Sequence, residues 1–250
     1  MALRAFAAVV ATALALLQPN GVRALVSNGM RGSMEALQPQ IEKAIGRPLA
    51  MEFGSTASLK KRIVAGEAFD VTIITTEAID DLIAQGKLTR ASRADVGRSE
   101  LGIGIRAGTA RPDIRTPAAL KKALQETPSV TYPQDGASRG TIEKMFERMG
   151  IAAEMKSKII LAPGSAAATE SVAAGRVAMV LTLFSEIVPT HGAEILGPLP
   201  GEFQSDIRFA AAIHVQSHDA NAAKALITFF TGPTAARVLK AKGIEPSRPL

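Results

Sequence analysis

Four short loops rich in small and hydroxyl-bearing residues stand out in this sequence, because each follows an apolar stretch and precedes a helical one. They span residues 28–33, 53–58, 134–141 and 163–169. Small residues let backbone N–H groups approach a ligand, and a helix N-terminus attracts negative charge. Any strand–turn–helix junction needs similar residues for turning and capping. Taken together, however, the loops predict one anion site assembled from several segments.

The elements around these loops must bring them to one edge of a sheet. Residues 34–45 carry apolar side chains at helical spacing, and residues 69–75 form a β-branched apolar run typical of a buried parallel strand. Strands and helices alternate over residues 25–85, which predicts a parallel sheet with helices on both faces. A second alternating unit covers residues 100–183, and an apolar strand at 207–215 precedes two closing helices.

We therefore expect an α/β protein of two lobes, each a mainly parallel sheet flanked by helices. Residues 25–104 and 208–250 are assigned to the first lobe, and residues 105–207 to the second. Extended segments near residues 100–106 and 205–215 are expected to cross between the lobes. Because ligands in open α/β sheets bind at the carboxyl ends of the strands, the four loops would face the cleft between the lobes.

Residues 1–24 differ in kind from the rest of the chain. Arg4 supplies a positive start, residues 5–17 are apolar and uncharged, and Val22-Arg23-Ala24 offers small residues where a signal peptidase reads. The apolar run is short for a membrane span of about 20 residues. We expect a signal peptide cleaved after Ala24, a periplasmic mature protein, and no membrane span in the mature chain.

Composition excludes several kinds of site. The chain has no cysteine, and its 3 histidines lack metal-ligand spacing, so we expect no metal. Gly102 and Gly104 do not make a dinucleotide fingerprint, and we expect no cofactor. One tyrosine, no tryptophan and scattered basic residues argue against nucleic acid. The formal net charge of +6 would help to attract a small anion, and we expect a monomer.

Three stretches make the chain similar to the periplasmic molybdate-binding proteins of ABC importers. They are residues 53–59 (FGSTASL), residues 63–71 (IVAGEAFDV), and residues 230–236 with the later Gly243-Ile244. The resemblance covers nearly all of residues 25–244. It implies a two-lobed type 2 periplasmic binding protein, a small anionic ligand, and an ABC importer permease as partner.

The resemblance also implies that loop hydroxyls and backbone N–H groups hold the ligand. The loops and the resemblance together predict the following ligand-binding residues: Asn28, Gly29, Met30, Arg31, Ser55, Thr56, Ala137, Ser138, Arg139, Ser165, Ala166 and Thr182.

The chain departs from the family pattern at three of these places. Met30 and Arg31 stand where a serine is usual, residues 182–184 occupy the place of a usual tyrosine, and Arg139 replaces a neutral residue. An arginine fork matches a carboxylate with two parallel hydrogen bonds. The two arginines therefore predict an anion with two or three carboxylates, unless they point to solvent or pair with the nearby Glu35 and Glu143.

Two functions fit this pattern, and the sequence leaves both open. The first is an exported solute-binding protein that closes on a molybdate-like oxyanion or a polycarboxylate for an ABC importer. The second is a periplasmic isomerase of a tricarboxylate, since the same superfamily branch includes isomerases of aconitate. Such an isomerase needs a base that moves a proton. Glu77 is the candidate catalytic residue, although capping of a helix is its structural alternative.

Overall fold

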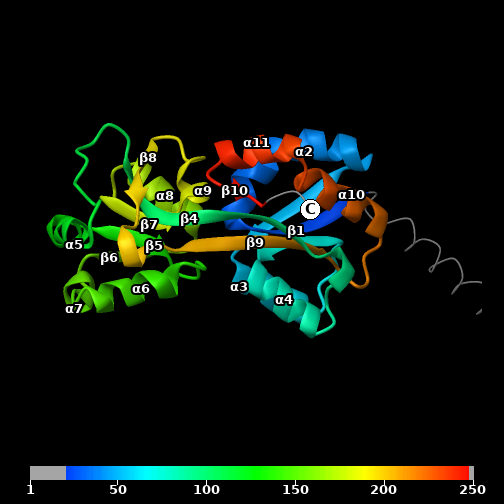
Figure 1. Ribbon diagram of the computed structural model, residues 1–250, viewed down its shortest axis with the longest axis horizontal. Coiled ribbons are helices and arrows are strands. Elements are labelled where there is room, and N and C mark those ends of the chain that lie inside the picture. Colours follow the sequence, from blue (N-terminus) through cyan, green and yellow to red (C-terminus); the bar gives the residue numbers. More distant parts are fainter. Residues whose placement is uncertain (1–20, 248–250) are drawn as a thin grey trace, which may run out of the picture.

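The structure is a computed structural model and describes residues 21–247. Two α/β lobes lie side by side, and they are connected by one long strand, β4, and by the segment that leads into β9 (Figure 1). The strands form one continuous path in the order β2-β1-β3-β9-β4-β7-β5-β6. The predicted two-lobed α/β architecture is confirmed.

The first lobe is a mixed sheet covered on both faces. β1 runs parallel to β2 and β3, whereas β9 runs antiparallel to β3 and β4. Helices α2, α10 and α11 pack on one face of this sheet, and α3 and α4 pack on the other. Its elements are β1 (Val22–Ser27), α2 (Arg31–Ile45), β2 (Leu49–Gly54), α3 (Thr56–Val64), β3 (Val71–Thr75), α4 (Thr76–Ala84), β4 (Ala94–Arg106), β9 (Asp206–Ile213), α10 (Ala220–Phe230), α11 (Pro233–Ala241) and β10 (Glu245–Pro246).

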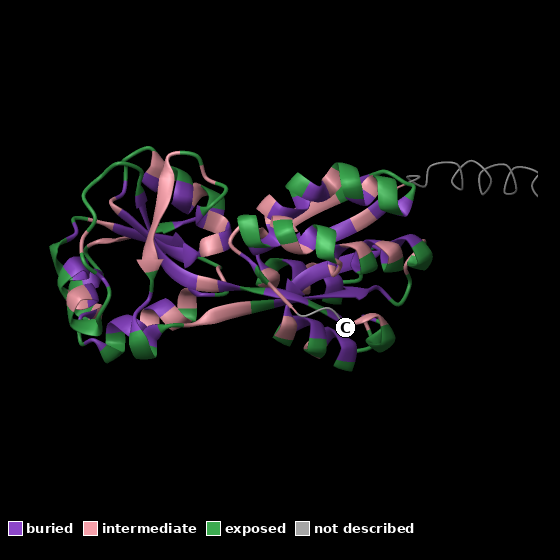
Figure 2. Cartoon of the chain, turned by 45° about the horizontal axis from the view of Figure 1, so that its top comes forward, coloured by how far each residue is buried: buried purple, intermediate pink, exposed green. Residues whose placement is uncertain are grey.

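Side-chain periodicity explains this packing. In β1, Val22, Ala24 and Val26 point to the cluster under α2, whereas Leu25 points to the cluster under α3 and α4. On α2 the residues at helical spacing are buried, and the helix ends at Gly46, whose φ of 68° lies in the left-handed region. Figure 2 shows the buried strands at the centre of each lobe and the exposed outer faces of the helices.

The second lobe repeats the scheme with a separate core. β5 lies parallel to β6 and β7, and the second half of β4 lies antiparallel to β7 and β8. Its elements are α5 (Pro117–Glu126), β5 (Val130–Pro133), α6 (Arg139–Arg148), α7 (Ala152–Met155), β6 (Ile159–Ala162), α8 (Ser165–Ala173), β7 (Met179–Leu183), α9 (Phe184–Ile187) and β8 (Ala193–Pro198).

β4 belongs to both lobes, because its two halves pair with different strands. Residues 94–100 of this strand pair with β9 in the first lobe, and residues 101–106 pair with β7 and β8 in the second. The backbone N–H of Leu101 donates to the carbonyl of Ser205 at 2.9 Å, just before β9 begins. The crossings therefore lie at Glu100–Leu101 and Ser205–Asp206. β4 is longer than the strand predicted over residues 100–106, because its first half pairs with β9.

A third connection joins the C-terminal segment to this crossing. The hydroxyl of Ser99 on β4 donates to the carbonyl of Gly243 at 2.9 Å, and it accepts from the N–H of Ser185 on α9 at 3.0 Å. A Cβ on Gly243 would lie 2.8 Å from the carbonyl carbon of Phe184. Glycine is therefore needed where the C-terminal segment approaches the second lobe.

The start of β1 bears on the predicted signal peptide. Val22 and Ala24 have no exposed surface, and the N–H of Arg23 donates to Asp70 Oδ2 at 2.9 Å. Cleavage after Ala24 would remove this half of the strand, while residues 1–20 of the predicted signal lie outside the described residues. Within residues 21–247, no helix is long and apolar enough to cross a membrane.

Candidate functional site

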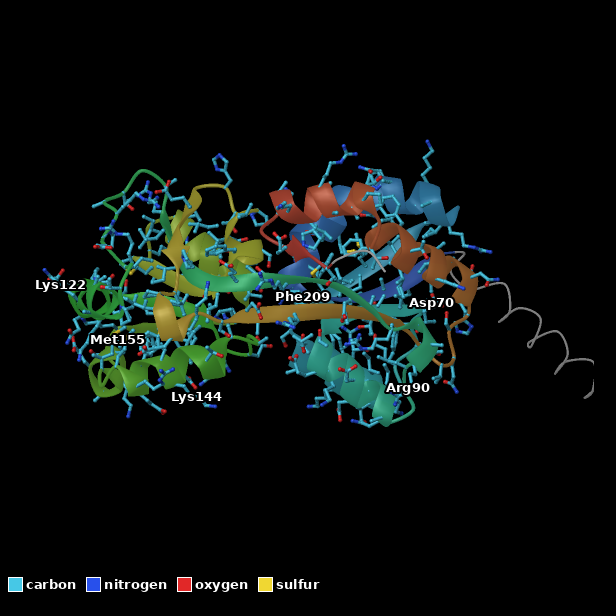
Figure 3. All side chains as sticks on the ribbon, viewed as in Figure 1. Asp70, Arg90, Lys122, Lys144, Met155 and Phe209 are labelled. Carbon is cyan, nitrogen blue, oxygen red and sulfur yellow. The ribbon has the colours of Figure 1, made fainter. Side chains whose placement is uncertain are left out.

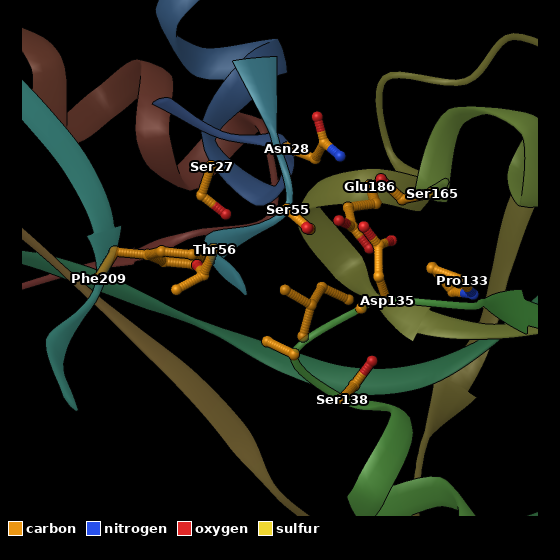
Figure 4. A pocket seen from close by; sticks show the side chains of 13 residues that line it. Ser27, Asn28, Ser55, Thr56, Pro133, Asp135, Ser138, Ser165, Glu186 and Phe209 are labelled. Carbon is orange, nitrogen blue, oxygen red and sulfur yellow. The ribbon is translucent and has the colours of Figure 1, made fainter. Parts of the chain in front are cut away.

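A small cavity lies where the two lobes meet, and we call it the inner cavity (Figure 4). The first lobe lines it with hydroxyl and amide side chains, the second lobe adds hydroxyls and two carboxylates, and Phe209 of β9 closes it on the side of the crossing strands. Its lining is Ser27, Asn28, Ser55, Thr56, Pro133, Asp135, Gly136, Ala137, Ser138, Ser165, Leu183, Glu186 and Phe209.

The fold brings the beginnings of three helices, and the turn that leads into a fourth, to this cavity. Each follows a parallel strand of its own lobe, so all four emerge at the carboxyl ends of strands. Ser55 caps α3 by accepting from the N–H of Ser58 at 3.1 Å, and Ser138 immediately precedes α6. Ser165 opens α8, and the turn that begins at Asn28 leads into α2. Free N–H groups at helix starts, together with hydroxyls, form a neutral set of donors for an anion.

The structure brings together half of the residues predicted to bind the ligand. Those that line the inner cavity are Asn28, Ser55, Thr56, Ala137, Ser138 and Ser165. Gly29 and Met30 are buried, and a Cβ on Gly29 would lie 2.7 Å from Cζ of Phe209, which lies between the two lobes (Figure 3). Thr182 is fully buried and reaches the cavity only through Glu186, to which its hydroxyl donates.

The two loop arginines are engaged elsewhere. Arg31 lies over the ring of Phe53, 4.1 Å from its centroid, and pairs with Glu35 at 3.3 Å. It faces a second depression, which we call the outer hollow, lined by Arg31, Gly32, Glu35, Ala166, Glu170, His191 and their neighbours. The outer hollow adjoins the inner cavity, because Asn28, Ser165 and Glu186 line both.

Arg139 points away from the inner cavity. Its Nε donates to Glu143 at 2.8 Å and its Nη1 donates to the carbonyl of Gln134 at 2.7 Å. The described lining of the inner cavity thus contains neither arginine nor lysine. Both guanidinium groups have the carboxylate partners that the sequence offered as the alternative to ligand binding.

Glu77 lies outside the inner cavity. Its side chain is exposed in the first turn of α4, and it lines a neighbouring surface depression together with Lys60 and Asp135. This position is compatible with helix capping, as the sequence allowed.

Glu186 is one of the two acidic residues in the described lining of the inner cavity, with Asp135, and neither was among the predicted site residues. It lies in the first turn of α9, directly after β7. Burial raises the pKa of the Glu186 carboxyl and the nearby Asp135 raises it further, while hydrogen bonds from Thr182, Ser165 and the Leu183 N–H lower it. The effect of burial is the largest of these, so the pKa of Glu186 lies above that of an ordinary glutamate. The sequence pattern that could have predicted Glu186 is an acidic residue just after a buried strand. The same pattern made Glu77 a candidate.

A family model described as bacterial extracellular solute-binding protein matches residues 22–245. The chain belongs to this family. An aconitate isomerase from a Pseudomonas species is 28% identical over 227 residues, covering 89% of this chain and 86% of that protein. A molybdate-binding protein of Azotobacter vinelandii is 25% identical over 229 residues, covering 89% and 88%.

Solved structures of solute-binding proteins agree with the fold. The periplasmic molybdate-binding protein of Azotobacter vinelandii has a TM-score of 0.73 at 20% identity, over 89% of this chain and 98% of that one. The sulfate-binding protein SubI of Mycobacterium tuberculosis also has a TM-score of 0.73, at 18% identity, over 92% and 88%. The resemblance to molybdate-binding proteins and the type 2 periplasmic binding fold are confirmed.

Proposed function

We propose that this solute-binding protein captures a small anion in the inner cavity after export and passes it to an ABC importer. One observation carries the proposal: the N-termini of α3, α6 and α8 with their hydroxyls, and the Asn28 turn ahead of α2, meet from both lobes around one cavity. Backbone N–H groups and hydroxyls hold an anion without a counter-charge. Because β4 and β9 join the lobes, a hinge motion there would close the donors around the anion.

The lining favours a compact oxyanion over a polycarboxylate. Two or three carboxylates would call for guanidinium forks, and those of Arg31 and Arg139 are paired with Glu35 and Glu143 outside the lining. Two relatives are named for the binding of molybdate and sulfate. We therefore place tetrahedral oxyanions first among the ligands to test.

A ligand screen tests this function. Purified protein is heated with molybdate, tungstate, sulfate, phosphate, citrate, cis-aconitate or trans-aconitate, and the hits are titrated by calorimetry. A ligand present at 100 times its Kd stabilises the native state by about 2.7 kcal/mol, which the midpoint of unfolding will report. Stabilisation by at least one anion, lost in the double variant Ser55→Ala/Ser138→Ala, supports the proposal. No stabilisation by any of them contradicts it.

A second candidate function is a tricarboxylate isomerase, and the carboxyl group of Glu186 favours it. One relative is an aconitate isomerase, and such a reaction needs a base at the substrate. Glu186 would remove a proton from the methylene carbon while the double bond shifts, and the proton would return to the other allylic carbon. Incubation with trans-aconitate, with the cis isomer followed over time, tests this function. Turnover that Glu186→Gln abolishes would support it.

A further inference from the structure

Glu186 is an acid inside a cavity that we assign to an anion, and the inference drawn from it rests on that proposed function. Thr182 holds its carboxylate from one side, and Asp135 reaches the same cavity from the loop before α6 (Figure 4). The two carboxylates point toward one another, and each carries a negative charge when ionised. An anion entering this cavity would meet repulsion from both. Protonation of one carboxylate removes its share of that repulsion.

We propose that Glu186 is a direct, proton-carrying contact of the ligand: when an anion binds, Glu186 takes up one proton from solvent and donates its O–H to the anion. The only covalent bond formed is this O–H bond, and no other bond is broken in the protein or the ligand. A neutral carboxyl can still accept from the hydroxyl of Thr182 through its other lone pairs. The acid then joins the neutral donors of the cavity.

The groups around Glu186 support protonation of this carboxyl rather than of another. Burial raises the pKa of Glu186, and Asp135 acts in the same direction. Asp135 is exposed at the edge of the cavity and keeps more contact with water. Water stabilises an ionised carboxylate, and Glu186 has less contact with water than Asp135.

Charged groups on the far side of Glu186 belong to the outer hollow. They are Arg31 and Glu35 of α2, Glu170 of α8, and His191 after α9. Arg31 pairs with Glu35, so these two charges largely offset each other at Glu186. If Glu186 carries the proton, replacing its carboxyl group will abolish the uptake of a proton on anion binding.

Calorimetry in two buffers with different enthalpies of protonation tests the coupling near neutral pH. Molybdate, sulfate and cis-aconitate serve as probes, because all three are fully ionised there. For the wild type we expect uptake of one proton per bound anion at any pH above the pKa of Glu186 in the free protein. Above the pKa of Glu186 in the free protein, affinity should then fall about tenfold for each pH unit.

Two variants make the test specific. Glu186→Gln keeps a donor and an acceptor of similar shape, so it should bind with the same heat in both buffers and lose the pH dependence. Glu147→Gln removes an exposed acid of α6 that lies outside the lining, and it should behave as the wild type. Equal heats in both buffers for the wild type, or proton uptake that survives in Glu186→Gln, would overturn the proposal.

The pKa of Glu186 can also be measured without a ligand, so that this test does not depend on the proposed function. In protein labelled with carbon-13 at the glutamate carboxyls, the signal lost in Glu186→Gln identifies Glu186. We expect this signal to titrate above the ordinary glutamate value of about 4.3. Titration at or below that value would refute the raised pKa by which the proton is assigned to Glu186, even if no probe binds. Failure of all probes with a raised Glu186 titration would instead count against anion capture.

Discussion

Gly32 of α2 lies directly against Pro189 of the second lobe, so that a Cβ on Gly32 would stand 2.5 Å from Cγ of that proline. This contact closes one side of the cleft between the lobes. A side chain at residue 32 can be accommodated if the lobes hinge apart, because neither element is buried deeply there. Gly32 therefore sets how closely the lobes approach each other.

Replacing Gly32 with alanine should weaken anion binding without unfolding the protein. The added methyl group holds the lobes apart, whereas alanine raises the helix propensity of α2 by up to about 1 kcal/mol. Calorimetry should show lower affinity with the best anion of the screen, and small-angle scattering should show a less compact liganded state.

Gly140→Ala is the matched control for this change. Gly140 is likewise the second residue of its helix, α6, and nothing lies within 4 Å of a Cβ placed on it. Affinity should be unchanged in this variant. Equal affinity in Gly32→Ala and the wild type would show that the contact with Pro189 does not limit closure.

The mature chain should begin before Val22. A chain that starts at Leu25 lacks a fully buried valine, worth about 1.5–3 kcal/mol, and the backbone hydrogen bond from Arg23 to Asp70. We expect the intact mass of exported protein to include residues 22–24. Recombinant protein starting at Leu25 should unfold at a lower temperature than one starting at Gly21. An exported chain that starts at Leu25 and is equally stable would contradict this prediction.

Asp70 should make stability depend on pH. Burial alone raises the pKa of Asp70, but hydrogen bonds from Arg23, Ser217, Asp219 and His218 outweigh it and hold the pKa below that of an ordinary aspartate. The stabilisation is therefore complete above the unfolded pKa of about 3.9 and is lost as the pH falls through the folded value.

Denaturant titrations over a range of pH measure this contribution. Asp70→Ala should lower the free energy of unfolding by about 1–3 kcal/mol at neutral pH and by less in acid, since it leaves buried donors unpaired. Asp80→Asn removes an acid paired with Arg93 at the surface and should change little. An equal loss at both pH extremes would argue against ionised Asp70 as the source.

Neither loop arginine should be needed for ligand affinity. Arg139→Ala breaks contacts to Glu143 and to the carbonyl of Gln134, and Arg31→Ala breaks contacts to Glu35 and Phe53. All of these lie outside the inner cavity, so each variant should bind the anion within about fivefold of the wild type. A loss of tenfold or more for citrate or aconitate would restore the polycarboxylate interpretation.

Local patterns in the sequence were sufficient to predict most of the first lobe and the position of the loops. Helical spacing in α2 and the β-branched run of β3 depend on near neighbours, and parallel strands place their carboxyl ends together. The convergence of Asn28, Ser55 and Ser138 on one cavity follows from that rule. By contrast, the length of β4 depends on pairing with β9, which lies about a hundred residues away in sequence and leaves no local signal.

The direction in which these side chains point could not be predicted from the sequence. Arg139 occupies a predicted loop, yet Glu143 one helical turn later draws its guanidinium away from the cavity. Glu77 and Glu186 both follow buried strands, and only the tertiary fold decides that one is exposed and the other lies between the lobes. Position in a loop could thus be predicted, whereas the direction of a side chain toward or away from the inner cavity could not.

The position of β9 in the sheet determines the order in which the two lobes can fold as the chain emerges. β9 lies between β3 and β4, so the first lobe lacks an inner strand until residues 206–213 have appeared. Every strand segment of the second lobe comes from residues 101–198. During synthesis or translocation the second lobe can therefore fold first, while the edge of β3 stays open to misfolding or to holding by a chaperone.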